Sequence, residues 1–130
     1  MNKKIISTGA IIGMLAIILG AFGAHALKKV LSAEQLTTFE TGVRYQMYHA
    51  LFLLFIGTIT ELSQKTKKTI YLLTVSGVFL FSGSIYLLAT NSFTSFDFKV
   101  IGFVTPIGGL LLILAWGTLF LNFYNKKSQN

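Results

Sequence analysis

Two histidines and one arginine beside long apolar segments are the residues of this chain best suited to chemistry. His25 and His49 are its two histidines, and imidazole nitrogens ligate haem iron and exchange protons near neutral pH. Arg44 opens an apolar stretch. Charged groups at membrane depth are costly and usually face a polar interior, so we expect these side chains to share one polar region.

Other polar side chains are predicted at a similar depth. Tyr45, Gln46 and His49 are three and four residues apart, which places them on one face of a helix. A helix rises about 1.5 Å per residue, and counting from the ends of the apolar segments puts this set in the outer half of the membrane. The predicted polar pocket consists of His25, Arg44, Tyr45, Gln46, His49, Ser82, Ser84 and Thr105. The alternatives are a buried hydrogen-bond network that fixes helix register, or simple contact with lipid head groups.

The composition gives little support to catalysis. The acidic residues are Glu34, Glu40, Glu61 and Asp97, and there is no cysteine. All four lie in connections or at the ends of apolar segments, so a carboxylate proton relay has no steps to use. No carboxylate pair, nucleophile elbow or metal-ligand spacing appears. We expect no catalytic residue, no metal site and no resident cofactor. The alternative is a redox subunit that binds a quinone, or a haem through His25 and His49.

Four long apolar segments must position these residues. They cover residues 5–27, 44–61, 69–90 and 100–124. A helix needs about 20 mostly apolar residues to cross the hydrocarbon core. Three segments reach that length without a formal charge, and the second reaches it if Arg44 and Glu61 extend to the interfaces. The sequence predicts an all-α integral membrane four-helix bundle that forms a single domain over residues 1–130.

The connection between the first two spans is predicted to carry a short amphipathic surface helix. Ser32 and Gln35 have the spacing of a capping box. The helix is expected over residues 33–41, with Gly42 ending it.

Small residues and one proline are expected to shape the packing of the spans. A bilayer does not reward helix contact through hydrophobicity, so close backbone approach at small residues replaces it. The predicted packing residues are Gly9, Gly13, Gly20, Gly23, Gly108 and Gly109. Pro106 lacks a backbone N–H, and we expect it to kink the fourth span.

Basic residues at the ends of the spans predict the orientation. Seven lysines fall on the side of the two termini, against four basic residues on the other side. Short loops rich in lysine stay in the cytoplasm, which predicts a multi-pass protein of the cell membrane with both termini cytoplasmic. The competing interpretation is a signal peptide cleaved near Ala24-His25-Ala26. The lysines flank spans, which does not indicate nucleic-acid binding.

Four motifs together resemble one known family. They are Gly20–Leu27, Phe39–Ala50, Phe81–Tyr86 and Thr105–Gly109, followed by Trp116. In this order they are similar to small membrane proteins of unknown function of the YgdD/YwdK type. The resemblance implies a four-span membrane protein in which His25 belongs to the mature chain. The resemblance does not indicate which molecular function the protein has.

Three functional hypotheses follow. The first is a non-enzymatic accessory protein, or one that binds a lipid or hydrophobic small molecule through the polar pocket. The second is the haem or quinone subunit, and the third is a small oligomeric transporter or channel. Membrane lipids are the expected partners, with a second copy or another membrane protein as the alternative.

Overall fold

The computed structural model describes residues 1–93 and 97–129, and these form a helical bundle without a strand. The long helices are α1 (Asn2–His25), α2 (Ala33–Thr58), α3 (Gln64–Ala89) and α4 (Val104–Gln129). Short 3₁₀ turns are η1 (Leu27–Lys29), η2 (Asn91–Phe93) and η3 (Phe98–Ile101). The predicted all-α bundle is confirmed. Residues 94–96 and 130 of the predicted domain lie outside the described residues.

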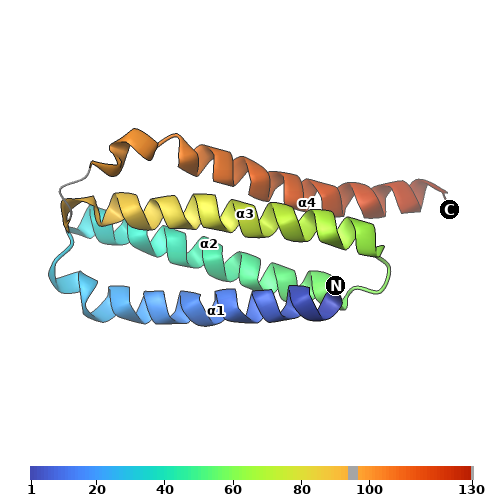
Figure 1. The fold of residues 1–130 in the computed structure, drawn as a ribbon, viewed down its shortest axis with the longest axis horizontal. Helices are drawn as coiled ribbons and strands as arrows, with labels where there is room; N and C mark the ends of the chain where they lie inside the picture. Colours follow the sequence, from blue (N-terminus) through green and yellow to red (C-terminus); the bar gives the residue numbers. More distant parts are fainter. Residues whose placement is uncertain (94–96, 130) are drawn as a thin grey trace.

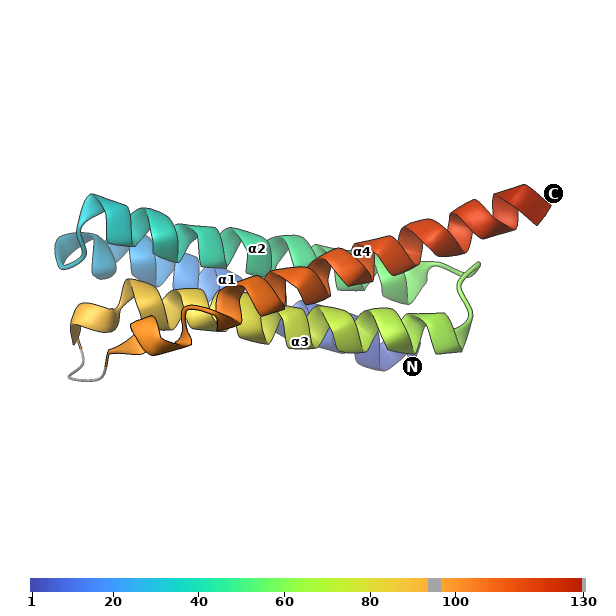
Figure 2. The ribbon, with the colours of Figure 1, turned by 90° about the horizontal axis from the view of Figure 1, so that it is seen from above.

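Each helix packs mainly against its neighbours in the sequence. α2 and α3 form the middle of the bundle, with α1 against α2 and α4 against α3 (Figures 1 and 2). Both termini lie at one end, which we call the terminal end, together with the α2–α3 turn (Figure 1). The opposite end carries η1, η2 and η3, and we call it the η end. This arrangement leaves α1 and α4 as the outer helices.

The outer surfaces of the helices are suited to lipid. α1, α3 and the segment containing α4 are each long and apolar enough to cross a membrane. α2 carries more charge and lies between α1 and α3 along their length (Figure 1). Large apolar side chains such as Ile17, Phe79 and Ile113 are more than 60% exposed. Exposed apolar surface of this extent is explained by contact with acyl chains.

The separate surface helix predicted over residues 33–41 is wrong. Ser32 caps a helix as expected, with Gln35 N–H donating to Ser32 Oγ and Ser32 N–H donating to Gln35 Oε1. That helix is α2, which continues through Gly42 without a break. Gly42 serves packing instead, because a methyl group there would lie 2.7 Å from the Tyr86 ring.

The kink predicted at Pro106 is also wrong. α4 begins at Val104, so Pro106 lies in its first turn. Backbone N–H groups in a first turn have no partner within the helix, and the missing N–H therefore costs nothing. The break in the chain precedes α4, between Thr90 and Val104, where η2 and η3 lie.

Glycine allows close backbone contact at two helix pairs. Gly108 of α4 lies against α3, where an added methyl group would be 2.8 Å from the carbonyl carbon of Leu80. Gly9 of α1 lies against α2, where the same group would be 2.9 Å from the Ala50 carbonyl oxygen. Gly13, Gly20 and Gly23 also face α2. Gly109 makes only ordinary contacts with the Phe81 ring.

Replacing Gly108 with alanine should separate α3 from α4. Overpacking against a backbone that cannot move aside costs about 1–3 kcal/mol, and the Gly108→Ala variant should lose that much stability in denaturant titrations followed by circular dichroism in detergent. Gly117→Ala is the matched control on the same helix, since a methyl group there meets nothing within 4 Å. Equal stability of the two variants would show that the close contact is absent.

Candidate functional site

The residues of the predicted polar pocket are divided among different cavities, with Gln46 and Ser82 in one and Tyr45 and His49 in another. Three hydrogen-bonded groups join different helices instead. Gln46 links α1, α2 and α3; His49 links α2 to α4; and Ser84 links α3 to α4. The arrangement corresponds to the register-fixing network that the sequence offered as an alternative.

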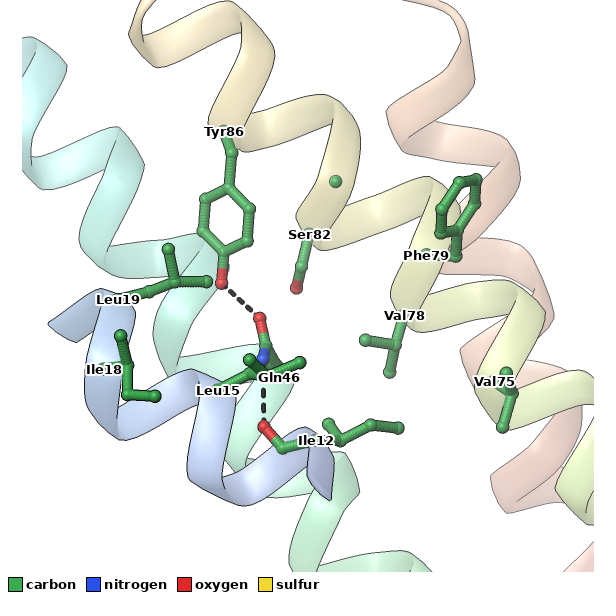
Figure 3. Close-up of a pocket in the computed structure, with 11 residues that line it drawn as sticks. Ile12, Leu15, Ile18, Leu19, Gln46, Val75, Val78, Phe79, Ser82 and Tyr86 are labelled. Carbon is green, nitrogen blue, oxygen red and sulfur yellow. Dashed lines mark hydrogen bonds between the residues drawn. The ribbon is translucent and has the colours of Figure 1, made fainter. Parts of the chain in front are cut away.

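Gln46 is the centre of the largest group and is 6% exposed. Its Nε2 donates to the carbonyl oxygen of Ile12 at 2.9 Å, and its Oε1 accepts from the hydroxyl of Tyr86. Beside it, Ser82 Oγ donates to the Gly42 carbonyl oxygen at 2.8 Å. One amide side chain therefore holds three helices at a fixed register (Figure 3).

His49 is 4% exposed and both of its ring nitrogens are engaged. Nδ1 lies 2.7 Å from the carbonyl oxygen of Tyr45, which can only accept, so Nδ1 carries the proton. Nε2 then accepts from Trp116 Nε1–H at 3.0 Å. The two bonds together require the neutral imidazole with hydrogen on Nδ1.

The remaining predicted residues are paired elsewhere or exposed. Ser84 and Thr105 share a hydrogen bond between their hydroxyl groups, close to the η end. Tyr45 is 40% exposed and packs on the rings of Tyr48 and Phe81. Arg44 and His25 are exposed and join neither the Gln46 nor the His49 group.

The two histidines are not placed to ligate one haem. Gly13 of α1 is level with Ala50 of α2, so His49 is close to the level of Gly13. His25 is 12 residues further along α1. At about 1.5 Å per residue, the two histidines are therefore roughly 18 Å apart along the helix axis. The prediction of similar depth failed because α2 starts at Ala33, well before Arg44, from which the depth was counted. Nε2 of His49 is also occupied by Trp116. Among the described residues no cluster of three metal-ligating side chains occurs.

A groove of about 360 Å³ lies between α1 and α3. The two helices meet near the terminal end, where Thr8 Oγ1 and Tyr71 OH are 3.1 Å apart, and the groove opens further along. Figure 3 shows its walls and the linked polar side chains at its floor. The lining residues are Ile12, Leu15, Ile18, Leu19, Gln46, Val75, Val78, Phe79, Ser82, Gly83 and Tyr86. We call this cavity the α1–α3 groove.

Sequence reasoning left Tyr86 and Trp116 out of the predicted pocket. A usable signal was present, because a tyrosine hydroxyl or an indole N–H within a span must find a partner. Tyr86 is four residues from Ser82 and therefore on the same helical face. Nothing in the order of the residues indicates that Trp116 reaches His49, since that contact depends on how α4 crosses α2.

Comparison with known proteins identifies the family. A family described as a protein of unknown function, DUF423, matches residues 19–109. The chain belongs to this family. No solved structure is similar to the chain.

Members of this family from several bacteria are similar over nearly the whole chain. The UPF0382 membrane protein SSP2132 of Staphylococcus saprophyticus is 40% identical, with 94% of this chain and 98% of the relative covered. The UPF0382 membrane protein YwdK of Bacillus subtilis is 37% identical, with 88% and 90% covered. The UPF0382 inner membrane protein YgdD of Escherichia coli is 34% identical, with 92% and 88% covered. The predicted resemblance is confirmed, and this chain is an integral membrane protein of that family.

Loss of the Gln46 amide should destabilise the bundle through Tyr86. Gln46→Leu leaves the tyrosine hydroxyl without its acceptor, and Tyr86→Phe removes the hydroxyl itself. In a double-mutant cycle measured by unfolding in detergent, we expect a coupling between about 0.6 and 1.7 kcal/mol, the mean and the maximum measured for hydrogen bonds between helices of a membrane protein. Tyr48→Phe, on an exposed ring of α2, is the control. Strict additivity of the Gln46 and Tyr86 changes would contradict the bond.

The tautomer of His49 can be measured directly. In ¹⁵N spectra of protein labelled at histidine, His49 should show a protonated Nδ1 and an unprotonated Nε2 at neutral pH. Trp116→Phe removes the donor to Nε2 and should shift that resonance while leaving the exposed His25 unchanged. A signal for the opposite tautomer in the unchanged protein would exclude the Trp116–His49 bond.

Proposed function

We propose that this protein is a non-enzymatic membrane protein that holds an apolar molecule, either a membrane lipid or a hydrophobic small molecule, in the α1–α3 groove. The observation that carries this proposal is the groove itself. Its walls are apolar on both helices, and its floor carries buried polar groups that are already bonded to one another. Such concave, mostly apolar and preformed cavities are typical ligand sites.

The floor of the groove supports binding rather than reaction. Both heteroatoms of the Gln46 side chain are bonded, and Ser82 donates its proton to a backbone carbonyl. A nucleophile or base must instead present its reactive atom to a substrate. The bonded floor keeps the groove open at a fixed width, because Gln46 ties α1 to α3 across α2. An apolar occupant would then fill a space that neither α1 nor α3 closes.

Filling the groove from α1 tests the proposal. Leu15 is 44% exposed and lines the groove, so Leu15→Trp should occupy it without disturbing the core. We expect native mass spectrometry of gently extracted protein to show one retained lipid or hydrophobic molecule, at least fivefold less abundant in this variant.

Ile17→Trp provides the matched control for Leu15→Trp. Ile17 lies on the same helix, is 65% exposed, and does not line the groove. It should retain the molecule at the level of the unchanged protein. Equal retention by Leu15→Trp and Ile17→Trp would contradict binding in this groove.

We further propose that the terminal end faces the cytoplasm. The lysines at this end are Lys3, Lys4, Lys65, Lys67, Lys68, Lys126 and Lys127, against Lys28, Lys29 and Lys99 at the η end. Excess lysine in short loops marks the cytoplasmic side. Lys67 contributes less than the other lysines to the positive charge at this surface because its side chain is buried, with Nζ donating to Asn2 Oδ1 at 3.0 Å.

Labelling of single cysteines tests this orientation, because the chain has no cysteine of its own. Lys28→Cys at the η end should react with an impermeant maleimide in intact cells. Lys65→Cys at the terminal end should react only after the membrane is permeabilised. Both side chains are exposed, so the reverse pattern would show that the orientation is inverted.

A further inference from the structure

A second groove lies on the other face of α3. It measures about 470 Å³ and is formed by α3, η3 and the start of α4. Its lining includes Leu80, Leu87, Ile101 and Val104, and we call it the α3–η3 groove. Phe79, Gly83 and Tyr86 line both this groove and the α1–α3 groove. The two cavities therefore approach each other across the lipid-facing side of α3.

Gly83 lies at the point where the two grooves meet. A methyl group at Gly83 would touch nothing within 4 Å, so this glycine is not needed for helix packing. Glycine within a helix is less favourable than alanine, and here no close contact offsets that cost. What its missing side chain provides is a low crossing between the grooves, with room for a molecule on both sides of α3.

Three lysines lie at the η end of the bundle, where α3 ends: Lys28, Lys29 and Lys99. Leu27 of η1 belongs to one apolar cluster with Ala89 at the end of α3, which places Lys28 and Lys29 of η1 at the η end, beyond Leu19 of the α1–α3 groove. Lys99 belongs to η3, whose Ile101 lines the other groove. The nearby carboxylate of Asp97 already accepts from the Lys99 backbone N–H at 3.0 Å and from Asn91 Nδ2 at 3.3 Å. The side chains of Lys28, Lys29 and Lys99 are exposed, so an external anion can reach their ammonium groups.

We propose that the occupant is one two-chain glycerophospholipid that straddles α3 at Gly83. This inference rests on the proposed function and names its ligand. One acyl chain lies in the α1–α3 groove and the other in the α3–η3 groove. The phosphate lies at the η end between Lys28 and Lys29 on one side and Lys99 on the other, because a phosphodiester complements their charge.

Three lipids test the contributions of the two acyl chains and of the phosphate separately. The delipidated protein in mild detergent is titrated with dioleoylphosphatidylglycerol, with its single-chain lysolipid, and with dioleoylglycerol, which lacks the phosphate. Native mass spectrometry counts the bound copies. We expect one phosphatidylglycerol per chain, with each of the other two lipids binding at least tenfold more weakly. Lysolipid binding as tight as that of phosphatidylglycerol would overturn the two-chain inference, and dioleoylglycerol binding as tight would overturn the role of the phosphate.

Substitutions that fill one groove at a time distinguish this inference from the proposed function. Leu15→Trp fills only the α1–α3 groove, and Leu87→Trp fills only the α3–η3 groove. Each should weaken phosphatidylglycerol binding at least tenfold. If Leu15→Trp alone weakens binding, the proposed function stands and the straddling lipid is excluded. If neither does, both proposals fail.

Gly83→Leu blocks the crossing and should also weaken binding at least tenfold. Its control is Gly117→Leu on α4, where an added Cβ likewise meets nothing within 4 Å. A photoreactive phosphatidylglycerol with a diazirine on each chain provides a test on the unsubstituted protein. It should label α1 and η3 together, and labelling confined to one of them would overturn the proposal.

Discussion

The hydrocarbon core gives apolar side chains no reason to prefer one another over lipid, and the rest of this structure depends on that constraint. The helices associate where a glycine lets two backbones approach, as Gly9 does with α2 and Gly108 with α3. Contacts of this kind act between pairs, and in this bundle they join α1 to α2 and α3 to α4. The central α2–α3 contact joins the two pairs. Along the α1–α3 groove no glycine brings the backbones of α1 and α3 together, and the groove therefore stays open between the two helices.

Hydrogen bonds between helices then fix the register of the helices, which close packing at glycines leaves free. Gln46 joins three helices and the His49–Trp116 bond ties α4 to α2. The Gln46 and His49 side chains both find their partners inside the protein, and a satisfied buried network of this kind favours a single helix register. The Gln46 bonds to Ile12 and Tyr86 also join the two walls of the α1–α3 groove. Stability and the proposed binding function therefore depend on the same side chains.

The helices themselves could be predicted from the sequence more fully than the contacts between them. Apolar length indicated the four long helices, and the Ser32 capping box located the start of α2. It could not show that α2 runs through Gly42, because the packing of Tyr86 against that glycine comes from another helix. Of the predicted pocket residues, Gln46, His49, Ser82 and Ser84 are buried, whereas His25, Arg44 and Tyr45 are exposed. The partners of the buried residues depend on how the helices cross, which the sequence does not give. The depth of His49 was misjudged for a related reason, since Arg44 does not mark the end of a helix.

The separation of α1 from α3 is the central claim, and paired cysteines in native membranes test it most directly. Gly13 and Ala50 face each other across α1 and α2, with a Cβ separation of 3.5 Å for a side chain at Gly13, which suits a disulfide. Leu15 and Val78 line the α1–α3 groove from opposite helices. Under mild oxidation the Gly13→Cys/Ala50→Cys pair should cross-link rapidly and the Leu15→Cys/Val78→Cys pair should not. Equally rapid cross-linking of both pairs would show that α1 packs directly on α3 and that the groove does not exist.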